Sequence, residues 1–84
     1  MATVEQRVKA VVARVLGIEV ARIKDEHSFT FDLGAKSVQS IELVAGFEEE
    51  FGIQLDEESA LAVTTVGSAI EYLAKVCQEQ GVAV

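Results

Sequence analysis

The 84-residue chain has no proline and no tryptophan, and it contains one cysteine, one histidine, four phenylalanines and one tyrosine. A single cysteine excludes a disulfide within the chain. One cysteine and one histidine cannot supply a zinc-binding cluster, and the acidic runs lack the ligand spacing of an EF-hand calcium loop. We therefore expect no metal site, and a core built mostly from valine, leucine, isoleucine and alanine with a few phenylalanines.

A long apolar run is also missing. No stretch approaches the roughly 18 apolar residues of a membrane-spanning helix, and the first residues lack the apolar segment of a secretory signal peptide. These absences predict a cytoplasmic protein without a membrane span. The chain length suits one domain with a single small core, which we expect to cover residues 1–84.

Positive charge is scarce in the second half of the chain. Residues 1–36 carry six basic and five acidic groups, whereas residues 37–84 carry one basic and nine acidic groups, for a total net charge of −7. Such a surface disfavours nucleic acids and anionic membranes as partners. It can be a solvated face that keeps the protein in solution. It can also be a docking surface, because a basic partner would relieve the repulsion between neighbouring acids.

Apolar residues recur at helical spacing in four segments, each bounded by a capping residue or by a glycine. The first segment is rich in valine, but its spacing of three and four residues favours a helix over a strand. The sequence therefore predicts an all-α fold, a four-helix bundle with three longer helices, one short helix and a long loop between the first and second helices. The expected helices are 4–16, 37–51 and 57–63, followed by a last helix that Thr64 or Thr65 caps and that frays at Gly81.

The connection between the first two helices, residues 17–36, is expected to be ordered, because apolar side chains along it can pin it to the core. Near the other end of the chain, Cys77 shares a helix face with other apolar residues and is expected to be a small core residue. His27 has polar neighbours and is interpreted as a loop residue. The side chains expected to pin the connection are Ile18, Val20, Ile23, Phe29, Phe31 and Leu33.

The stretch FDLGAKSVQSIELVAGFEEEFG places Ser37 between a glycine-containing loop and the second helix. At or beside the N-cap, the amide groups of the first turn are unpaired and the helix dipole favours an anion. The simplest interpretation of Ser37 is a helix cap, which serine favours. The alternative is an attachment site for a phosphate ester.

A helical projection gives the second helix an apolar side and an acidic side. Val38 lies on the acidic side, where an apolar residue is more useful to a docking partner than to a core. The predicted apolar side holds Ser40, Leu43, Val44, Phe47 and Phe51. The predicted acidic side holds Val38, Gln39, Glu42, Ala45, Gly46 and Glu49.

From about Thr3 to Cys77 the sequence resembles the acyl carrier proteins. The resemblance rests on TVEQRV, SFTFDLGAKSV, IELVAGFEEEFGIQL and TTVGSAIEYL, in this order and spacing. Members of that family are four-helix domains that carry 4'-phosphopantetheine on the serine of a DLGxDSL-like motif. The resemblance implies this cofactor on Ser37, a phosphopantetheinyl transferase that attaches it, and acyl groups held as thioesters on its thiol. It implies a carrier without catalytic groups, and we expect a monomer.

The resemblance also implies two sets of contact residues. In the family, enzymes with basic docking patches recognise the acidic second helix, and a growing acyl chain shelters between helices. The usual Asp and Leu beside the serine are replaced here by Lys36 and Val38, which suggests a carrier for a specialised acyl pathway. The predicted partner-binding residues are Lys36, Val38, Glu42, Ala45, Glu48 and Glu49. The predicted acyl-chain pocket contains Phe47, Ala60, Leu61 and Val63.

Two other functions compete with the carrier. An enzyme with Ser37 as nucleophile is disfavoured, because the only histidine lies ten residues upstream and no third group is spaced to orient it. An unmodified acidic interaction module is the second alternative. Nothing in the sequence separates a carrier of fatty acid synthesis from a carrier of polyketide or other specialised synthesis.

Overall fold

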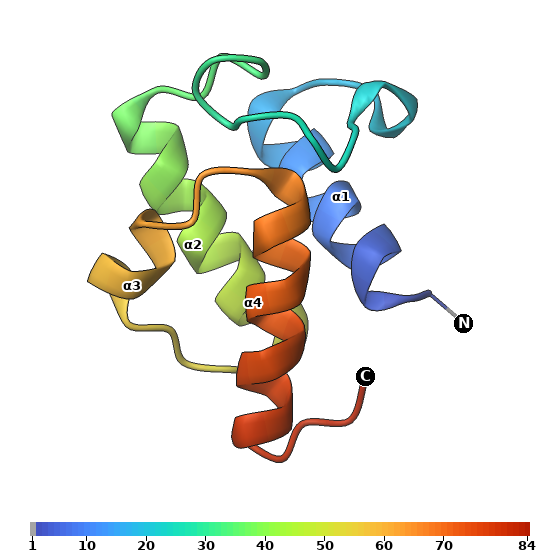
Figure 1. Cartoon of the computed structure of the whole chain (residues 1–84), viewed down its shortest axis with the longest axis vertical. Helices are drawn as coiled ribbons and strands as arrows, with labels where there is room; N and C mark the ends of the chain where they lie inside the picture. The colour runs from blue at the N-terminus through green and yellow to red at the C-terminus, as the bar shows by residue number, and fades with distance from the viewer. Residues whose placement is uncertain (1) are drawn as a thin grey trace.

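The computed structural model describes residues 2–84. Over this range the chain forms four α-helices and no β-strand, so the predicted all-α bundle with a long first connection is confirmed (Figure 1). An isolated antiparallel bridge joins Ser28 to Thr65. The elements are α1 (Val4–Leu16), the short 3₁₀ helix η1 (Val20–Arg22), α2 (Ser37–Phe51), α3 (Glu57–Leu61) and α4 (Val66–Glu79).

Helix α1 begins and ends as its sequence predicts. Thr3 Oγ1 accepts a hydrogen bond from Gln6 N at 3.1 Å, and Gln6 Oε1 accepts one from Thr3 N at 2.8 Å. These two bonds satisfy amide groups that the helix itself cannot pair. Gly17 ends the helix with a φ of 68°, a left-handed conformation that residues with a Cβ rarely adopt. The prediction of a capping box and a glycine stop is confirmed.

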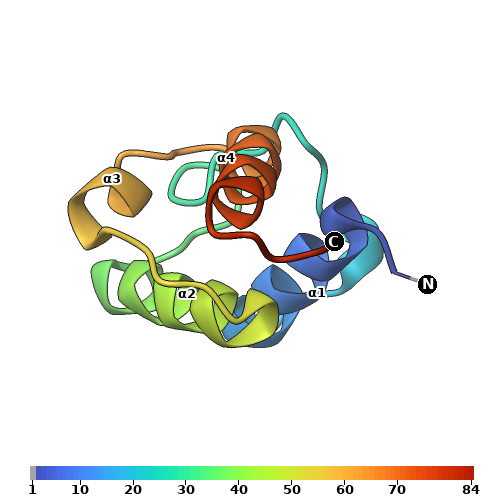
Figure 2. The ribbon, with the colours of Figure 1, turned by 90° about the horizontal axis from the view of Figure 1, so that it is seen from below.

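Helix α1 packs against both α2 and α4. Figure 2 shows α2 running beside α1, with α4 viewed nearly along its axis. At the far end of α2, the guanidinium of Arg7 stacks 4.4 Å from the ring centroid of Phe51. The same guanidinium donates from Nε to Glu50 Oε2 at 2.8 Å and from Nη2 to the Glu50 carbonyl at 2.8 Å. One arginine thus fixes the end of α2 to α1.

The core contains mainly aliphatic side chains, as predicted. Cys77 is fully buried, which confirms it as a core residue. Ile70 is partly buried, and Val76 is part of the core. The buried apolar residues are Val8, Val11, Val12, Ile23, Phe29, Ala35, Leu43, Val44, Phe47, Phe51, Ile53, Val66, Ala69, Leu73, Val76 and Cys77.

Three details of the predicted packing are wrong. Val20 is 49% exposed because it lies on η1, and Phe31 is 94% exposed because it lies in a tight turn. Gly46 is buried, not on the acidic side, because α1 approaches α2 so closely there that a Cβ would lie 2.8 Å from Val11 Cγ1. Helix α3 ends at Leu61, two residues earlier than predicted.

The connection between α1 and α2 is fastened to the start of α4. Gly67 N donates to the Asp25 carbonyl at 2.8 Å, and Val66 N donates to the His27 carbonyl at 3.0 Å. Lys9 Nζ lies 2.8 Å from Asp25 Oδ1, and this hydrogen bond raises the pKa of Lys9. The connection is therefore ordered, as predicted, although backbone bonds hold it as much as apolar side chains do. No helix within residues 2–84 has the length and apolar character needed to cross a membrane.

Candidate functional site

Ser37 is the first residue of α2, directly after the N-cap residue Lys36. Gln39 Oε1 accepts a hydrogen bond from Lys36 N at 2.9 Å. The Lys36 side chain cannot return the bond, because an ammonium group has no acceptor. The amide groups of the first turn therefore lack a side-chain cap and can bind an anion. The prediction that Ser37 lies at or beside the N-cap is confirmed.

The loop before α2 raises Ser37 out of the core. Ala35 is buried, and its N donates to the Phe29 carbonyl at 2.8 Å. Gly34 just before it has a φ of 71°, which a residue with a Cβ would adopt only with strain. Two residues beyond this buried anchor, Ser37 is exposed. The hydroxyl can therefore be reached from solvent while the backbone that carries it is fixed.

The outer face of α2 combines free carboxylates with exposed apolar groups. Glu42, Ala45 and Glu49 are exposed, and neither glutamate forms an ion pair within residues 2–84. Val38 is 62% exposed and Ile41 is 51% exposed. The sequence analysis did not single out Ile41, although its place three residues after Val38 puts it on a neighbouring position of the helix. This face is unoccupied by any other part of the described chain.

Two other glutamates of α2 are held in structural contacts. Glu48 is half-buried, and its Oε2 accepts a hydrogen bond from Leu55 N at 2.9 Å. Glu50 pairs with Arg7. The structure thus separates Glu48, which holds the segment after α2, from the two free charges at Glu42 and Glu49.

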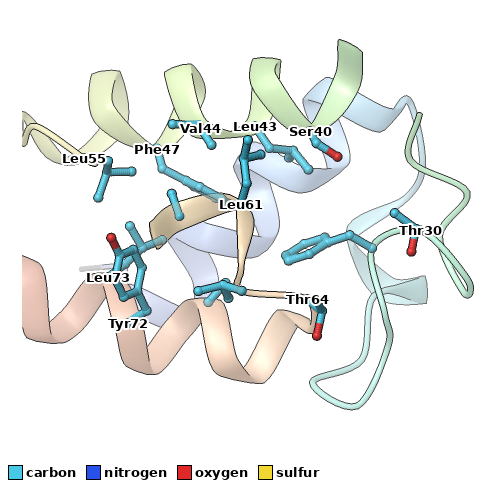
Figure 3. Close-up of a pocket in the computed structure, with 14 residues that line it drawn as sticks. Thr30, Ser40, Leu43, Val44, Phe47, Leu55, Leu61, Thr64, Tyr72 and Leu73 are labelled. Atoms are coloured by element: carbon cyan, nitrogen blue, oxygen red, sulfur yellow. The ribbon is translucent and has the colours of Figure 1, made fainter. Parts of the chain in front are cut away.

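A cavity of about 90 Å³ lies between α2, α3 and α4. Figure 3 shows Thr30 and Ser40 at one end of it and Leu55 and Tyr72 at the other. Since Ser40 is one helical turn from Ser37, the first of these ends faces the candidate attachment site. The four predicted pocket residues all line this cavity. Its walls contain Phe29, Thr30, Ser40, Leu43, Val44, Phe47, Leu55, Ala60, Leu61, Val63, Thr64, Ala69, Tyr72 and Leu73.

The polar groups in the cavity wall are hydroxyls. Burial, together with the nearby carboxylates of Asp56 and Glu79, raises the pKa of Tyr72, so its phenol stays neutral. Helical periodicity identified the wall that α2 contributes, including Ser40. No sequence pattern predicted that Leu55 and Tyr72 line the cavity, because their positions depend on how the segment after α2 folds against α4.

His27 is not part of the site around Ser37. Its Nδ1 accepts a hydrogen bond from Lys24 N at 3.1 Å. It lines a separate polar hollow with Arg22 and Asp32, and Ser37 does not contribute to that hollow. The described residues therefore do not assemble a serine–histidine pair of the kind a nucleophilic serine requires.

A family model described as "Phosphopantetheine attachment site" matches residues 6–73. The chain belongs to this family. Domains of this family carry covalently attached 4'-phosphopantetheine, so this domain is a phosphopantetheine carrier. Such domains are typically non-catalytic, and they interact with a phosphopantetheinyl transferase and with enzymes that handle acyl groups. An exposed hydroxyl beside uncapped amide groups suits a phosphodiester, so the residues present fit the cofactor.

Proposed function

We propose that the protein is an acyl carrier protein with 4'-phosphopantetheine on Ser37. One observation supports this residue over the others. Within residues 2–84, Ser37 is the serine whose hydroxyl forms no hydrogen bond with the protein. The other four serines are engaged at Ser28, Ser40, Ser59 and Ser68. A free, exposed hydroxyl at the start of a helix is available as a nucleophile.

The modification is a phosphoryl transfer from coenzyme A. Ser37 Oγ attacks the phosphorus that bears the pantetheine arm. The new P–O bond forms as a P–O bond of the pyrophosphate breaks, adenosine 3',5'-bisphosphate leaves with the electron pair, and the hydroxyl proton passes to a base of the transferase. The chain itself contributes position, because Ser37 is held at the start of α2, where the uncapped amides of the first turn would stabilise an attached phosphate.

The attached arm supplies a thiol that holds acyl groups as thioesters. Tethering raises the effective concentration of the acyl group near each enzyme that docks on the carrier. We assign the acyl groups to fatty acid synthesis or to a specialised pathway such as polyketide synthesis. Lys36, whose ammonium is exposed beside the attachment site, supports a specialised carrier, because a cation there repels a basic docking patch.

The cavity between α2, α3 and α4 suits an acyl chain, since most of its wall is apolar. Its volume of about 90 Å³ is smaller than the ~150 Å³ cavity that accepts benzene in another protein. A chain of more than a few carbons must therefore widen it. Helix α3 is the element that can move most easily, because it has five residues and none of them is buried.

The test is mass spectrometry of the apo protein after incubation with coenzyme A and a broad-specificity phosphopantetheinyl transferase. We expect wild type to gain the mass of one phosphopantetheine group and Ser37→Ala to gain none. Ser40→Ala is the matched control, because Ser40 lies one turn further along the same helix, and it should be modified like wild type. An unmodified wild type would support the unmodified interaction module, and modification of Ser37→Ala would place the arm elsewhere.

The docking face is a second part of the proposal. We assign Val38, Glu42, Ala45 and Glu49 to contacts with basic enzyme patches, with Lys36 and Glu48 beside them. Free surface charges steer encounters more than they stabilise a complex, and exposed pairs contribute about 0–1 kcal/mol each. We therefore expect the charges to affect the association rate and its salt dependence.

Charge reversal tests this face. The double variant Glu42→Lys/Glu49→Lys should be modified more slowly by the transferase at low ionic strength, and the difference from wild type should shrink with added salt. The matched control is Glu71→Lys/Glu79→Lys, which changes the net charge equally on exposed positions of α4. Equal slowing by both pairs would attribute the effect to net charge and remove the face from the proposal.

A further inference from the structure

Among the large apolar residues within residues 2–84, Phe31 is the most solvent-exposed, at 94%. Phe29, two residues earlier, is buried. Phe29 is therefore part of the core, whereas Phe31 is exposed to solvent. Phenylalanine is usually buried in folded proteins, and it is enriched at interfaces between proteins relative to the rest of the surface.

The turn that carries Phe31 is closed around Ser28. Phe31 N donates to Ser28 Oγ at 3.0 Å, and Ser28 N donates to Asp32 Oδ2 at 2.7 Å. Asp32 N and Leu33 N both donate to the Ser28 carbonyl, each at 3.1 Å. Four hydrogen bonds within six residues leave the backbone little freedom. Phe31 is thus presented outward by an ordered turn.

The base of the turn is joined to the rest of the site. Phe29 N donates to the Thr64 carbonyl at 3.0 Å, and the Phe29 carbonyl accepts from Ala35 N at 2.8 Å. Binding through Phe31 would therefore require little ordering of the backbone. Contacts from a preorganised group lose less of their favourable free energy to entropy than contacts from a mobile one.

Phe31 lies in the neighbourhood of Ser37. Two residues span at most ~7 Å on either side of the bonded pair Phe29 and Ala35, so the two Cα atoms are within about 20 Å. Figure 3 shows Thr30, the residue before Phe31, at the same end of the cavity as Ser40. A standard interface covers about 800 Å² on each partner, which corresponds to a disc of roughly 16 Å radius. Because such a disc is about 32 Å across, an enzyme that forms a bond to Ser37 can also cover Phe31.

We propose that Phe31 is a docking anchor for the phosphopantetheinyl transferase, and that its ring enters an apolar pocket on that enzyme. This inference rests on the proposed modification of Ser37. The free carboxylates Glu42 and Glu49 call for a basic rim on the same enzyme, so the partner surface combines an apolar pocket with surrounding cations. Phe31 contributes affinity on the loop side of Ser37, and the acidic face of α2 contributes steering on the other side.

The experiment measures kcat and KM of the transferase for the apo protein, with coenzyme A saturating. Phe31→Ala should raise KM about tenfold, which corresponds to about 1.4 kcal/mol of binding, and leave kcat within about twofold because Ser37 is untouched. Phe31→Leu should restore most of the affinity, since an apolar side chain can still fill the pocket. Val20→Ala is the control, because Val20 is another exposed apolar residue of the same connection, and it should behave like wild type.

Two further measurements distinguish the possible outcomes. The KM difference for Phe31→Ala should persist at high salt, because the lost contact is apolar, whereas the effect of Glu42→Lys/Glu49→Lys should fade. The melting temperature should stay within a few degrees of wild type, because Phe31 is 94% exposed and its ring buries little surface in the fold. An unmodified wild type would overturn the proposed function. If wild type is modified but Phe31→Ala has the same KM as wild type, this inference alone is overturned. The same holds if Val20→Ala raises KM as much as Phe31→Ala does. Sedimentation showing that wild type self-associates through Phe31 would also overturn it in favour of a second copy as the partner.

Discussion

Replacing Gly46 by alanine sets two effects of opposite sign against each other. Glycine inside a helix destabilises it by about 1 kcal/mol relative to alanine, so propensity alone predicts a more stable protein. In this fold the new Cβ would lie 2.8 Å from Val11 Cγ1, which is closer than real contacts allow. Val11 is 1% exposed, and a β-branched side chain in a helix has one strongly preferred rotamer, so it cannot turn away.

The steric effect should prevail. Overpacking a filled core costs about 1–3 kcal/mol, so we expect Gly46→Ala to lower the free energy of unfolding by roughly 0–2 kcal/mol after the gain in propensity is subtracted. Val11→Ala removes the clashing atom, and alone it should destabilise by about 2 kcal/mol through lost burial and a small cavity. In that background, Gly46→Ala should become stabilising by about 1 kcal/mol.

Urea unfolding of the four proteins in this cycle measures the coupling between the two positions. We expect the double variant to be more stable than Val11→Ala, with a coupling of about 1–3 kcal/mol. The reasoning is refuted if Gly46→Ala stabilises the wild-type protein by about 1 kcal/mol, or if its effect is the same in both backgrounds. Either outcome would mean that α1 and α2 do not meet as closely as the structure has them.

Three further predictions concern Cys77, Asp56 and Lys36. Burial raises the pKa of the Cys77 thiol. At pH 8 a thiol reagent should therefore label Cys77 of the native apo protein slowly and the thiol of the phosphopantetheine arm in the native holo protein quickly, and in denaturant both thiols should react. Fast labelling of the native apo protein would contradict this prediction. Hydrogen bonds from Ser59 lower the pKa of Asp56. Its capping of α3 therefore stabilises the fold at pH values above 3.8, the ordinary pKa of an aspartate, and this stabilisation is lost as the pH falls through the lowered pKa. The difference in unfolding free energy between wild type and Asp56→Ala should therefore vanish in acid. A constant difference from pH 7 to pH 2 would exclude this cap. Lys36→Asp should raise the free energy of unfolding by about 0.5–1 kcal/mol, because aspartate can cap α2 where lysine cannot. The same substitution should speed modification of Ser37 by a general transferase. An unchanged melting temperature and an unchanged modification rate would make Lys36 a neutral residue.

The sequence was sufficient for features that depend on local chemistry. The capping box of Thr3 and Gln6 and the glycine at position 17 determine where α1 begins and ends. Ser37 at the start of α2 followed from the loop, the helical period and the resemblance to carrier domains. The four predicted pocket residues meet around one cavity because Ala60 and Leu61 lie in α3, Val63 follows it, and α3 packs against α2, which contributes Phe47.

Features that depend on how segments meet could not be predicted. Phe31 is a residue type that is expected in the core, and only the hydrogen bonds around Ser28 show that its turn points outward. Gly46 appeared to lie on the acidic side because the projection did not include the close approach of α1. The bond from Leu55 N to Glu48 likewise links residues whose pairing depends on the path of the chain after α2.

The two sides of α2 can therefore carry separate tasks. Gly46 and the bonds from Arg7 secure one side to α1, and Phe47 closes the core beneath it. Because these contacts hold the helix, the outer side with Glu42 and Glu49 is not needed for packing. The repulsion between free carboxylates on this side lowers stability little, because the other side of the helix is fixed. Substitutions on the outer side should therefore change the recognition of partners while the fold persists. On the proposed docking face, successive enzymes can bind the outer side of α2 without disturbing the core that positions Ser37.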